Sequence, residues 1–236
     1  MMKSLLKYFF ILFAVAATIH SCKKDPPQSD PVDFGYNYFP DQVGSYIIYQ
    51  VDSIDYDDPL PRPPDTTRYL LKEVIASSFP DNSGRPTLRL ERFYKIYNDS
   101  VPYDSMNWTG PRVWTANKTA STVEKREENI PYLKLVFPTN EGQEWNGNVY
   151  NTLGQKAYEI ISTNVPETIN SVSFDSVVTV KQFERINFIE YRYEAEKYAR
   201  NVGLVYKVRD SIYHGGDSVN AKKGYKFKQK IVSYGY

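Results

Sequence analysis

The sequence predicts an all-β, mainly antiparallel domain of about eleven strands with little helix. Three observations predict it. From residue 44 onward, apolar and polar residues alternate with a period of two, as in Thr87–Tyr97. The alternating runs are rich in β-branched and aromatic residues, and the chain contains 21 Tyr and 12 Phe. Clusters of Pro, Asn, Asp and Gly separate the runs, at residues 80–84, 146–148 and 214–217.

The candidate strands follow one another with short turns between them. They are expected at residues 46–51, 67–77, 87–97, 112–118, 122–126, 133–137, 157–163, 173–184, 186–194, 203–211 and 223–234. The best helix candidate, 194–200, is short. Because each strand has one apolar and one polar face, we expect a single antiparallel sheet with one solvated side. Its architecture would be a half-barrel, an open barrel or a sandwich.

Composition excludes several function classes. The net charge of +1 argues against nucleic-acid binding driven by bulk charge. One cysteine excludes a disulfide scaffold and any CxxC zinc or redox site. The chain lacks the GxGxxG, P-loop, HExxH and GxSxG motifs, and His214 lies in Tyr-His-Gly-Gly-Asp, a sequence typical of a hairpin turn. We therefore expect a protein that is not an enzyme, with no catalytic residue, metal or cofactor.

The first residues have the composition of a targeting segment. Lys3 and Lys7 precede a 12-residue apolar run, 8–19, which is too short to span a bilayer as a helix. The run ends in Ile-His-Ser-Cys, which resembles a bacterial lipobox, and Cys22 is the chain's one cysteine. In lipoproteins with this motif, a peptidase cuts before the cysteine and its sulfur receives a diacylglycerol. We expect a signal peptide at 1–21 and a membrane anchor on Cys22; the alternative is a secretory signal with an incidental cysteine.

A tether and one β domain are expected after the cleavage point. Residues 22–33 are rich in Pro and charge, which favours an extended linker, and residues 34–236 contain the strand pattern. The Lys/Asp cluster after Cys22 resembles the surface-export signal of Bacteroidetes lipoproteins. We expect the protein to lie on the bacterial outer membrane, at the cell surface rather than on the periplasmic face.

Three segments resemble a group of Bacteroidetes outer-membrane lipoproteins. Phe39–Tyr46 opens with Phe-Pro-x-x-x-Gly, Phe137–Trp145 repeats this pattern, and Lys197–Tyr206 contains Tyr-Ala-x-x-Val-Gly-Leu-Val. We expect the first two to lead into two equivalent halves of the sheet, whereas a further Phe-Pro-x-x-x-Gly copy at Phe79–Gly84 is expected to be a hairpin turn. The resemblance covers residues 34–236. It implies a single, strongly curved sheet similar to the half-barrels of lipoprotein carriers, and no assigned activity.

The expected function is a non-enzymatic binding or structural role in the cell envelope. A partner protein or ligand would be held by loops or by the concave sheet face. One alternative is a glycan-binding surface lipoprotein, and another is a carrier or sensor of a hydrophobic ligand. The candidate ligand-binding rings are Tyr103, Trp108 and Trp114, which could instead pack the core.

Clustered carboxylates leave two further alternatives open. Paired carboxylates can hydrolyse glycosides, and the candidates are Glu124, Glu127, Glu128, Glu190, Glu194 and Glu196. The other interpretation is that these residues face solvent. Oxygen ligands can hold Ca²⁺, and the candidates are Asp55, Asp57 and Asp58. The other interpretation is a solvated loop.

A recurring Asp-Ser or Asp-Thr pair resembles the O-glycosylation sequon of Bacteroidetes envelope proteins. In each case an apolar residue or Thr follows the pair. The hydroxyls that would be modified are Ser53, Thr66, Ser100, Ser105, Ser176, Ser211 and Ser218. The alternative is ordinary turn chemistry that leads into strands.

The lipobox interpretation predicts the result of one substitution. Cys22→Ser removes the sulfur that would be acylated, so the chain is expected to lose its acyl mass and to leave the membrane fraction. Intact-mass spectrometry of wild type and variant, extracted from membranes and from the soluble fraction, measures both effects. An unacylated wild-type chain would contradict the lipobox interpretation.

Overall fold

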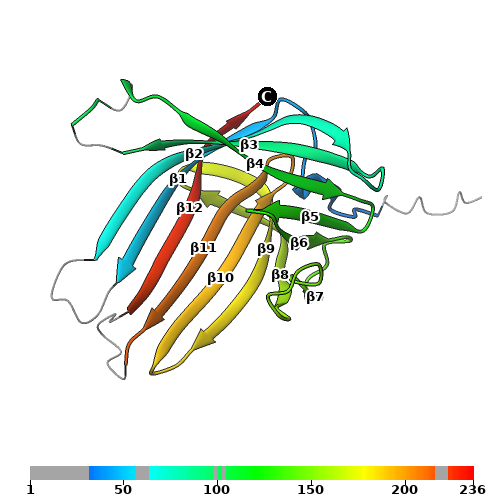
Figure 1. Ribbon diagram of the computed structural model, residues 1–236. Coiled ribbons are helices and arrows are strands. Elements are labelled where there is room, and N and C mark those ends of the chain that lie inside the picture. The colour runs from blue at the N-terminus through cyan, green and yellow to red at the C-terminus, as the bar shows by residue number, and fades with distance from the viewer. Residues whose placement is uncertain (1–31, 57–63, 98–99, 103–104, 216–222) are drawn as a thin grey trace, which may run out of the picture. The chain divides into compact units, whose positions relative to one another are not determined.

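The computed structural model describes residues 32–56, 64–97, 100–102, 105–215 and 223–236 (Figure 1). Residues Asp33–Tyr236 form one compact unit. This unit contains a short 3₁₀ helix, η1 (Tyr36–Tyr38), and one sheet. The strands of the first half of the sheet are β1 (Tyr46–Tyr56), β2 (Asp65–Pro80), β3 (Pro86–Ile96), β4 (Thr109–Lys118), β5 (Thr122–Glu127) and β6 (Ile130–Val136). Those of the second half are β7 (Glu144–Asn146), β8 (Ala157–Ile169), β9 (Val172–Ile186), β10 (Glu190–Ala199), β11 (Gly203–Tyr213) and β12 (Lys223–Gly235).

All described strands belong to one antiparallel sheet, which confirms the expected all-β class. The strand order is β6-β5-β4-β3-β2-β1-β12-β11-β10-β9-β8-β7. Two consecutive meanders, β1–β6 and β7–β12, are therefore joined by the pairing of β1 with β12, where Tyr46 lies opposite Gly235. The first and last strands of the domain are neighbours, and the two edge strands, β6 and β7, are consecutive in the sequence.

The two edge strands also meet, so the sheet nearly closes on itself. The Leu133 backbone N–H in β6 donates to the Gly147 carbonyl just after β7, at 2.9 Å. The Trp145 indole N–H donates to the Leu133 carbonyl at 2.9 Å, and the Asn151 amide donates to the Pro131 carbonyl at 2.8 Å. These bonds use edge groups that would otherwise be unpaired.

The two outer Phe-Pro-x-x-x-Gly segments make equivalent contacts before the two halves of the sheet. The Gly44 N–H donates to the Ile75 carbonyl in β2, and the Gly142 N–H donates to the Ile160 carbonyl in β8. Both glycines have positive φ, 96° and 81°, a conformation that glycine adopts without steric cost. The Phe79–Gly84 copy instead makes the β2–β3 turn, where the Gly84 N–H donates to the Asp81 carbonyl. These bonds agree with the expected roles of the three segments.

Apolar side chains from both halves of the sheet share one core. Leu90 in β3, Val123 in β5 and Leu135 in β6 pack in the same cluster as Ile160 in β8 and Val180 in β9. All five are at most 2% exposed. Burial of this apolar area favours closure of the sheet, because contacts between the two halves remove both inner faces from water.

The sequence-based assignment was wrong at two places. Residues 194–200 were the best helix candidate, but β10 runs through them as far as Ala199. Glu194, Glu196 and Tyr198 alternate there with a period of two, and long-range pairing with β9 and β11 outweighs local helix propensity. The twelfth strand, β7, was missed because its three residues are too short to show a period.

Within the described residues, no helix is long and apolar enough to cross a membrane.

The shared core predicts a stability effect. Leu135 is fully buried, so Leu135→Ala is expected to lower the free energy of unfolding by about 2–5 kcal/mol. Ile186→Ala, at a position 60% exposed, is the matched control and should change it by about 0.5 kcal/mol or less. Urea unfolding of both variants measures the difference. Equal effects would contradict the placement of Leu135 in the core.

Candidate functional site

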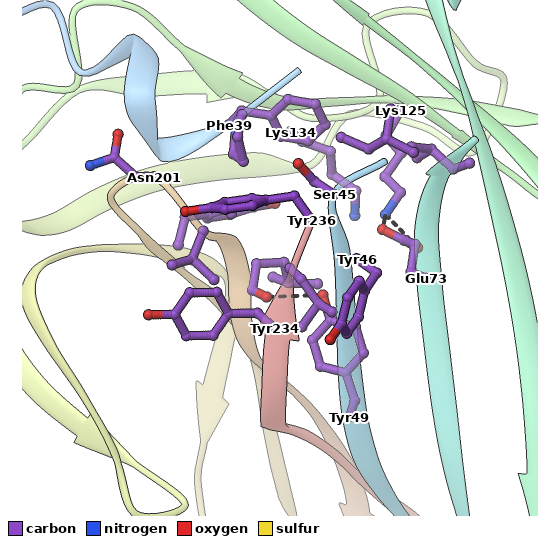
Figure 2. Close-up of a pocket in the computed structure, with 18 of the residues that line it drawn as sticks. Phe39, Ser45, Tyr46, Tyr49, Glu73, Lys125, Lys134, Asn201, Tyr234 and Tyr236 are labelled. Atoms are coloured by element: carbon purple, nitrogen blue, oxygen red, sulfur yellow. Dashed lines mark hydrogen bonds and ion pairs between the residues drawn. The ribbon is translucent and has the colours of Figure 1, made fainter. Parts of the chain in front are cut away.

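A pocket, which we call the mouth pocket, lies between three parts of the chain: the Phe-Pro segment Phe39–Tyr46, the Tyr-Ala segment Tyr198–Leu204 and the end of β12. Its cavity volume is about 60 Å³. The walls are apolar and aromatic, with Phe39, Tyr46, Ile75, Leu204, Tyr234 and Tyr236 among the lining residues. Figure 2 shows the rings of Tyr46, Tyr234 and Tyr236 around the pocket. Phe39–Tyr46 and Tyr198–Leu204, two of the three segments singled out in the sequence, therefore converge on one site.

Hydrogen bonds from residues on either side of Phe39–Tyr46 hold the two segments together. The Asn201 N–H donates to the Asn37 carbonyl at 2.7 Å, and the Tyr49 hydroxyl donates to the Leu204 carbonyl at 2.9 Å. Gly203 has a φ of 98°, and a Cβ at this position would lie 3.3 Å from Pro40 Cδ. A side chain at residue 203 would thus be strained and would crowd the pocket wall.

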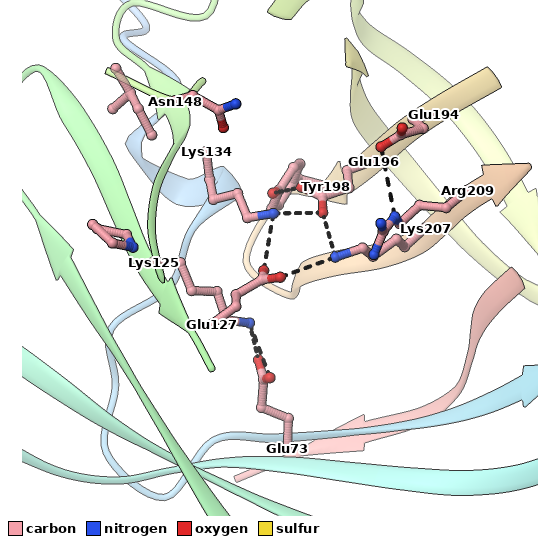
Figure 3. Close-up of polar contacts among 12 residues, drawn as sticks. Glu73, Lys125, Glu127, Lys134, Asn148, Glu194, Glu196, Tyr198, Lys207 and Arg209 are labelled. Carbon is pink, nitrogen blue, oxygen red and sulfur yellow. Dashed lines mark hydrogen bonds and ion pairs between the residues drawn. The ribbon is translucent and has the colours of Figure 1, made fainter. Parts of the chain in front are cut away.

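Charged side chains from opposite halves of the sheet meet below these walls in what we call the ion network. Its members are Glu73, Arg92, Lys125, Glu127, Lys134, Glu196 and Lys207. Lys134 Nζ in β6 lies 3.0 Å from a Glu127 oxygen and 2.9 Å from Glu196 Oε1. Lys207 Nζ in β11 lies 3.3 Å and 3.0 Å from the same two carboxylates (Figure 3). The network therefore bridges β5 and β6 to β10 and β11.

A second group of charges continues the network towards β2 and β3. Lys125 Nζ donates to both Glu73 oxygens at 2.8 and 3.0 Å, and Arg92 Nε lies 3.2 Å from Glu73 Oε2. The Arg92 guanidinium also stacks 3.5 Å from the centroid of the Trp114 ring. This is cation–π geometry, which stabilises a desolvated arginine beside an aromatic face.

The pKa values of the central groups are set by a competition between burial and pairing. Burial raises the pKa of the Glu196 carboxyl, but Lys134 and Lys207 outweigh burial and lower this pKa to about 2. The same competition places the pKa of Glu127 well below its ordinary value. Burial lowers the pKa of Lys134, but Glu127 and Glu196 raise it well above its ordinary value. All three groups are therefore charged at neutral pH.

The Tyr198 hydroxyl completes the pairing of Glu196. It donates to Glu196 Oε2 at 2.6 Å, and its ring packs in the shared core. Burial first, and then the Glu196 charge, raise the pKa of Tyr198 well above its ordinary value. Tyr198 is therefore a neutral donor that fixes the orientation of the carboxylate.

The structure revises the interpretation of the carboxylate clusters. Glu196 is 1% exposed and Glu194 is 8% exposed, so the expectation that these residues face solvent was wrong for both. Glu127 is also largely buried, with a side-chain exposure of 15%. Each of the three carboxylates is paired with a lysine: Glu127 and Glu196 with Lys134, and Glu194 with Lys156.

The predicted binding rings lie in different environments. Trp108 is 36% exposed, with Lys95 Nζ 5.4 Å from its centroid. Trp114 is half-buried against the core, where Arg92 covers one of its faces. Tyr103 lies outside the described residues. Neither Trp108 nor Trp114 is among the described residues that line the mouth pocket. The role of the three rings in ligand binding stays a prediction.

The predicted O-glycosylation hydroxyls also differ in accessibility. Thr66, Ser100 and Ser105 are exposed, while Ser53 and Ser211 are half-buried within strands. The Ser176 hydroxyl is hydrogen-bonded to the Tyr38 hydroxyl at 2.7 Å and donates to Asn164 Oδ1 at 3.0 Å. Ser218 lies outside the described residues, as does the predicted anchor, Cys22.

The calcium alternative concerns residues that are mostly not described, because Asp57 and Asp58 lie outside the described ranges. Across the described residues, no group of three or more His, Cys, Asp or Glu could hold a metal ion.

The ion network was missed by sequence reasoning, although a signal was present. In several strands the apolar phase continues into charged residues: Leu88 and Leu90 lead to Arg92, and Val123 leads to Lys125 and Glu127. Charged residues at the inward-facing positions of neighbouring strands indicate that these charges form ion pairs inside the sheet.

Comparisons with known proteins give structural neighbours only. No family model and no curated protein matches the sequence. A protein from Bacteroides fragilis, provisionally named as exported with a YmcC-like fold, is 12% identical with a TM-score of 0.46, covering 87% of this chain and 100% of that chain. A provisionally named lipoprotein from Parabacteroides distasonis is 13% identical with a TM-score of 0.34, covering 86% and 100%.

A third neighbour is a domain from Vibrio parahaemolyticus, provisionally named as an outer-membrane lipoprotein-sorting protein. It is 10% identical with a TM-score of 0.21, and covers 81% of this chain and 85% of that chain. Because all three TM-scores lie below 0.5, these similarities assign neither a family nor a function.

The network predicts a large effect of removing one charge. Glu196→Gln leaves Lys134 and Lys207 short of a buried partner, so the free energy of unfolding should fall by about 3–5 kcal/mol. Glu159→Gln is the matched control, because Glu159 pairs with Lys181 at 2.8 Å on the surface and should cost about 0–1 kcal/mol. Urea unfolding compares the two; similar losses would contradict a buried network.

The lowered carboxyl pKa values also predict acid sensitivity. A carboxyl whose pKa is lowered by folding stabilises the folded state above its unfolded pKa, and this contribution disappears as pH falls through the folded value. Stability should therefore drop between pH 4.5, the ordinary value, and about 2, the value for Glu196. Glu196→Gln should show a shallower drop. Urea unfolding of wild type and variant across this pH range measures the drop. An equal dependence of the free energy of unfolding on pH in the two proteins would contradict the lowered pKa of Glu196.

Proposed function

We propose that this chain is a lipid-anchored protein of the bacterial cell envelope that binds a ligand in the mouth pocket without transforming it. The observation that carries the proposal is the convergence of two sequence segments, Phe39–Tyr46 and Tyr198–Leu204, on one aromatic-walled pocket. Apolar pockets with a few polar groups are the usual sites for small ligands. The lipobox-like segment that ends at Cys22 supports the anchor.

The charges at the base of the pocket support binding rather than catalysis. A general acid or base works best with a pKa near the operating pH. Here the pKa values of Glu127 and Glu196 are lowered and that of Lys134 is raised, all of them away from neutrality. Groups that keep one charge state at neutral pH can orient a ligand electrostatically, but they are poorly suited to transfer protons.

The size of the mouth pocket favours a small occupant. Its volume is about 60 Å³, whereas pockets for drug-sized ligands hold about 300–1,000 Å³. We infer that it holds one ring or short alkyl group of a larger molecule rather than a whole acyl chain. This favours recognition of an exposed group over transport of a lipid inside the sheet.

Glycan binding is the second candidate, and a different observation favours it. The exposed Trp108 ring has Lys95 Nζ 5.4 Å from its centroid, so an aromatic face and a cation are presented together outside the pocket. Glycan arrays with wild type and Trp108→Ala separate the two candidates. Binding that depends on Trp108 would favour this surface over the mouth pocket.

Filling the pocket tests the leading proposal. Ser45 lines the pocket, and its backbone N–H and carbonyl make the turn and sheet bonds, so Ser45→Trp should add an indole without removing those bonds. We expect loss of binding of a neutral fluorescent probe, Nile red, and loss of any small molecule that co-purifies from the membrane. The matched control, Ser78→Trp, lies at an exposed position and should behave as wild type.

Fluorescence titration and native mass spectrometry measure these two losses. Unchanged binding in Ser45→Trp would contradict the pocket assignment. Hydrolytic turnover abolished by Glu196→Gln would contradict the non-enzymatic role.

A further inference from the structure

A second cavity of about 150 Å³ lies beside the ion network, and charged and amide side chains make up most of its lining residues. We call it the polar cavity. Its cations are Lys134, Lys156, Lys207 and Arg209, and its amides are Asn148 and Gln182. Figure 3 shows Lys134, Asn148, Lys207 and Arg209 around this region. It shares Lys134 and Glu127 with the mouth pocket.

Positive charge exceeds negative charge at this cavity. Four cations line it, and three carboxylates pair with them: Glu127, Glu194 and Glu196. Glu194 Oε2 accepts from Lys156 at 2.7 Å and lies 3.7 Å from Arg209 Nε. Arg209 has no closer carboxylate among the described ion pairs, and it also contacts Tyr225, whose hydroxyl lies 3.5 Å away. The Arg209 side chain is 48% exposed, so its guanidinium is open to solvent and accessible to a dissolved anion.

A buried amide supplies an independent observation. Gln182 is 3% exposed and lines the polar cavity, yet its Nε2 has no hydrogen-bond partner among the described residues. A buried donor without an acceptor costs about 1–3 kcal/mol, so such groups normally have a partner. An acceptor in the cavity would remove this cost.

We propose that the polar cavity binds a tetrahedral oxyanion, a phosphate or sulfate group, through Lys156, Lys207, Arg209 and Gln182. Such a group carries only acceptor atoms and negative charge, which match the excess cation and the unpartnered N–H donor. The arginine guanidinium and the lysine ammonium groups form charge-assisted bonds with it. The same group can come from a free anion or from the headgroup of an anionic lipid.

A set of charge variants tests this proposal, because loss of a cation and loss of a carboxylate should change the phosphate affinity in opposite directions. The probe is inorganic phosphate, titrated calorimetrically against chloride at matched ionic strength, because surface attraction is screened equally in both. Lys156→Gln and Arg209→Gln should each weaken phosphate binding about tenfold or more. Glu194→Gln removes a competing carboxylate and should strengthen binding several-fold. Lys181→Gln, from a surface pair, should leave the affinity unchanged.

If these charges had a purely structural role, Glu194→Gln would not increase the phosphate affinity while the two cation variants decrease it. No phosphate binding by wild type, or weaker binding in Glu194→Gln, would overturn the proposal. Ser45→Trp should keep phosphate binding, so this result and that of the mouth pocket can be separated.

Vesicles distinguish the two sources of the anion. Flotation with phosphatidylcholine vesicles, with and without phosphatidic acid, is compared in wild type and Arg209→Gln. Arg209-dependent binding to the anionic vesicles alone supports a lipid headgroup, whereas phosphate binding without vesicle binding supports a free anion. Absence of both would overturn the proposal.

Discussion

The buried ion network is the constraint on which the rest of this structure depends. Moving several charges out of water is costly, and only close pairing compensates. Lys134 and Lys207 compensate for Glu127 and Glu196 across the interior, so the two halves of the sheet must close for the charges to be paired. The same pairing supplies the base of the mouth pocket and one side of the polar cavity. The charges of the network therefore produce an electrostatic field in both cavities, and this field does not change near neutral pH.

Closure of the sheet depends on local chemistry at its edges as well as on this interior. The Leu133 and Gly147 backbone groups join β6 to the end of β7, and the Trp145 indole adds a second bond to the Leu133 carbonyl. Gly147 lets the Tyr158 ring of β8 pack directly against the backbone here, because a Cβ on residue 147 would lie 2.4 Å from that ring. The pairing of β1 with β12 joins the other ends of the two meanders, so the described sheet forms a nearly continuous wall around the network.

Most of the fold followed from the sequence, because the period-two alternation of short strands is a local signal. The roles of the three Phe-Pro-x-x-x-Gly segments were also readable, since their glycines occupy turns. The ion network could not be predicted from the sequence, because the pairing of its charges depends on the tertiary structure. Lys134 and Glu196, for example, are 62 residues apart. A lysine in an apolar strand phase indicates burial, but the strand order that supplies its partner cannot be read from one strand. For the same reason, β10 was taken in part as a helix.

The most direct test of the fixed-charge interior is a measurement of its carboxyl pKa values. Carbon-detected NMR of the glutamate side chains, titrated from neutral pH downward in wild type and Glu196→Gln, observes Glu127 and Glu196 individually. We predict that both carboxyls remain ionised well below pH 4.5, with Glu196 titrating at about 2. A pKa near neutrality for either carboxyl would contradict it, because that group could then exchange protons with a bound molecule rather than only hold it.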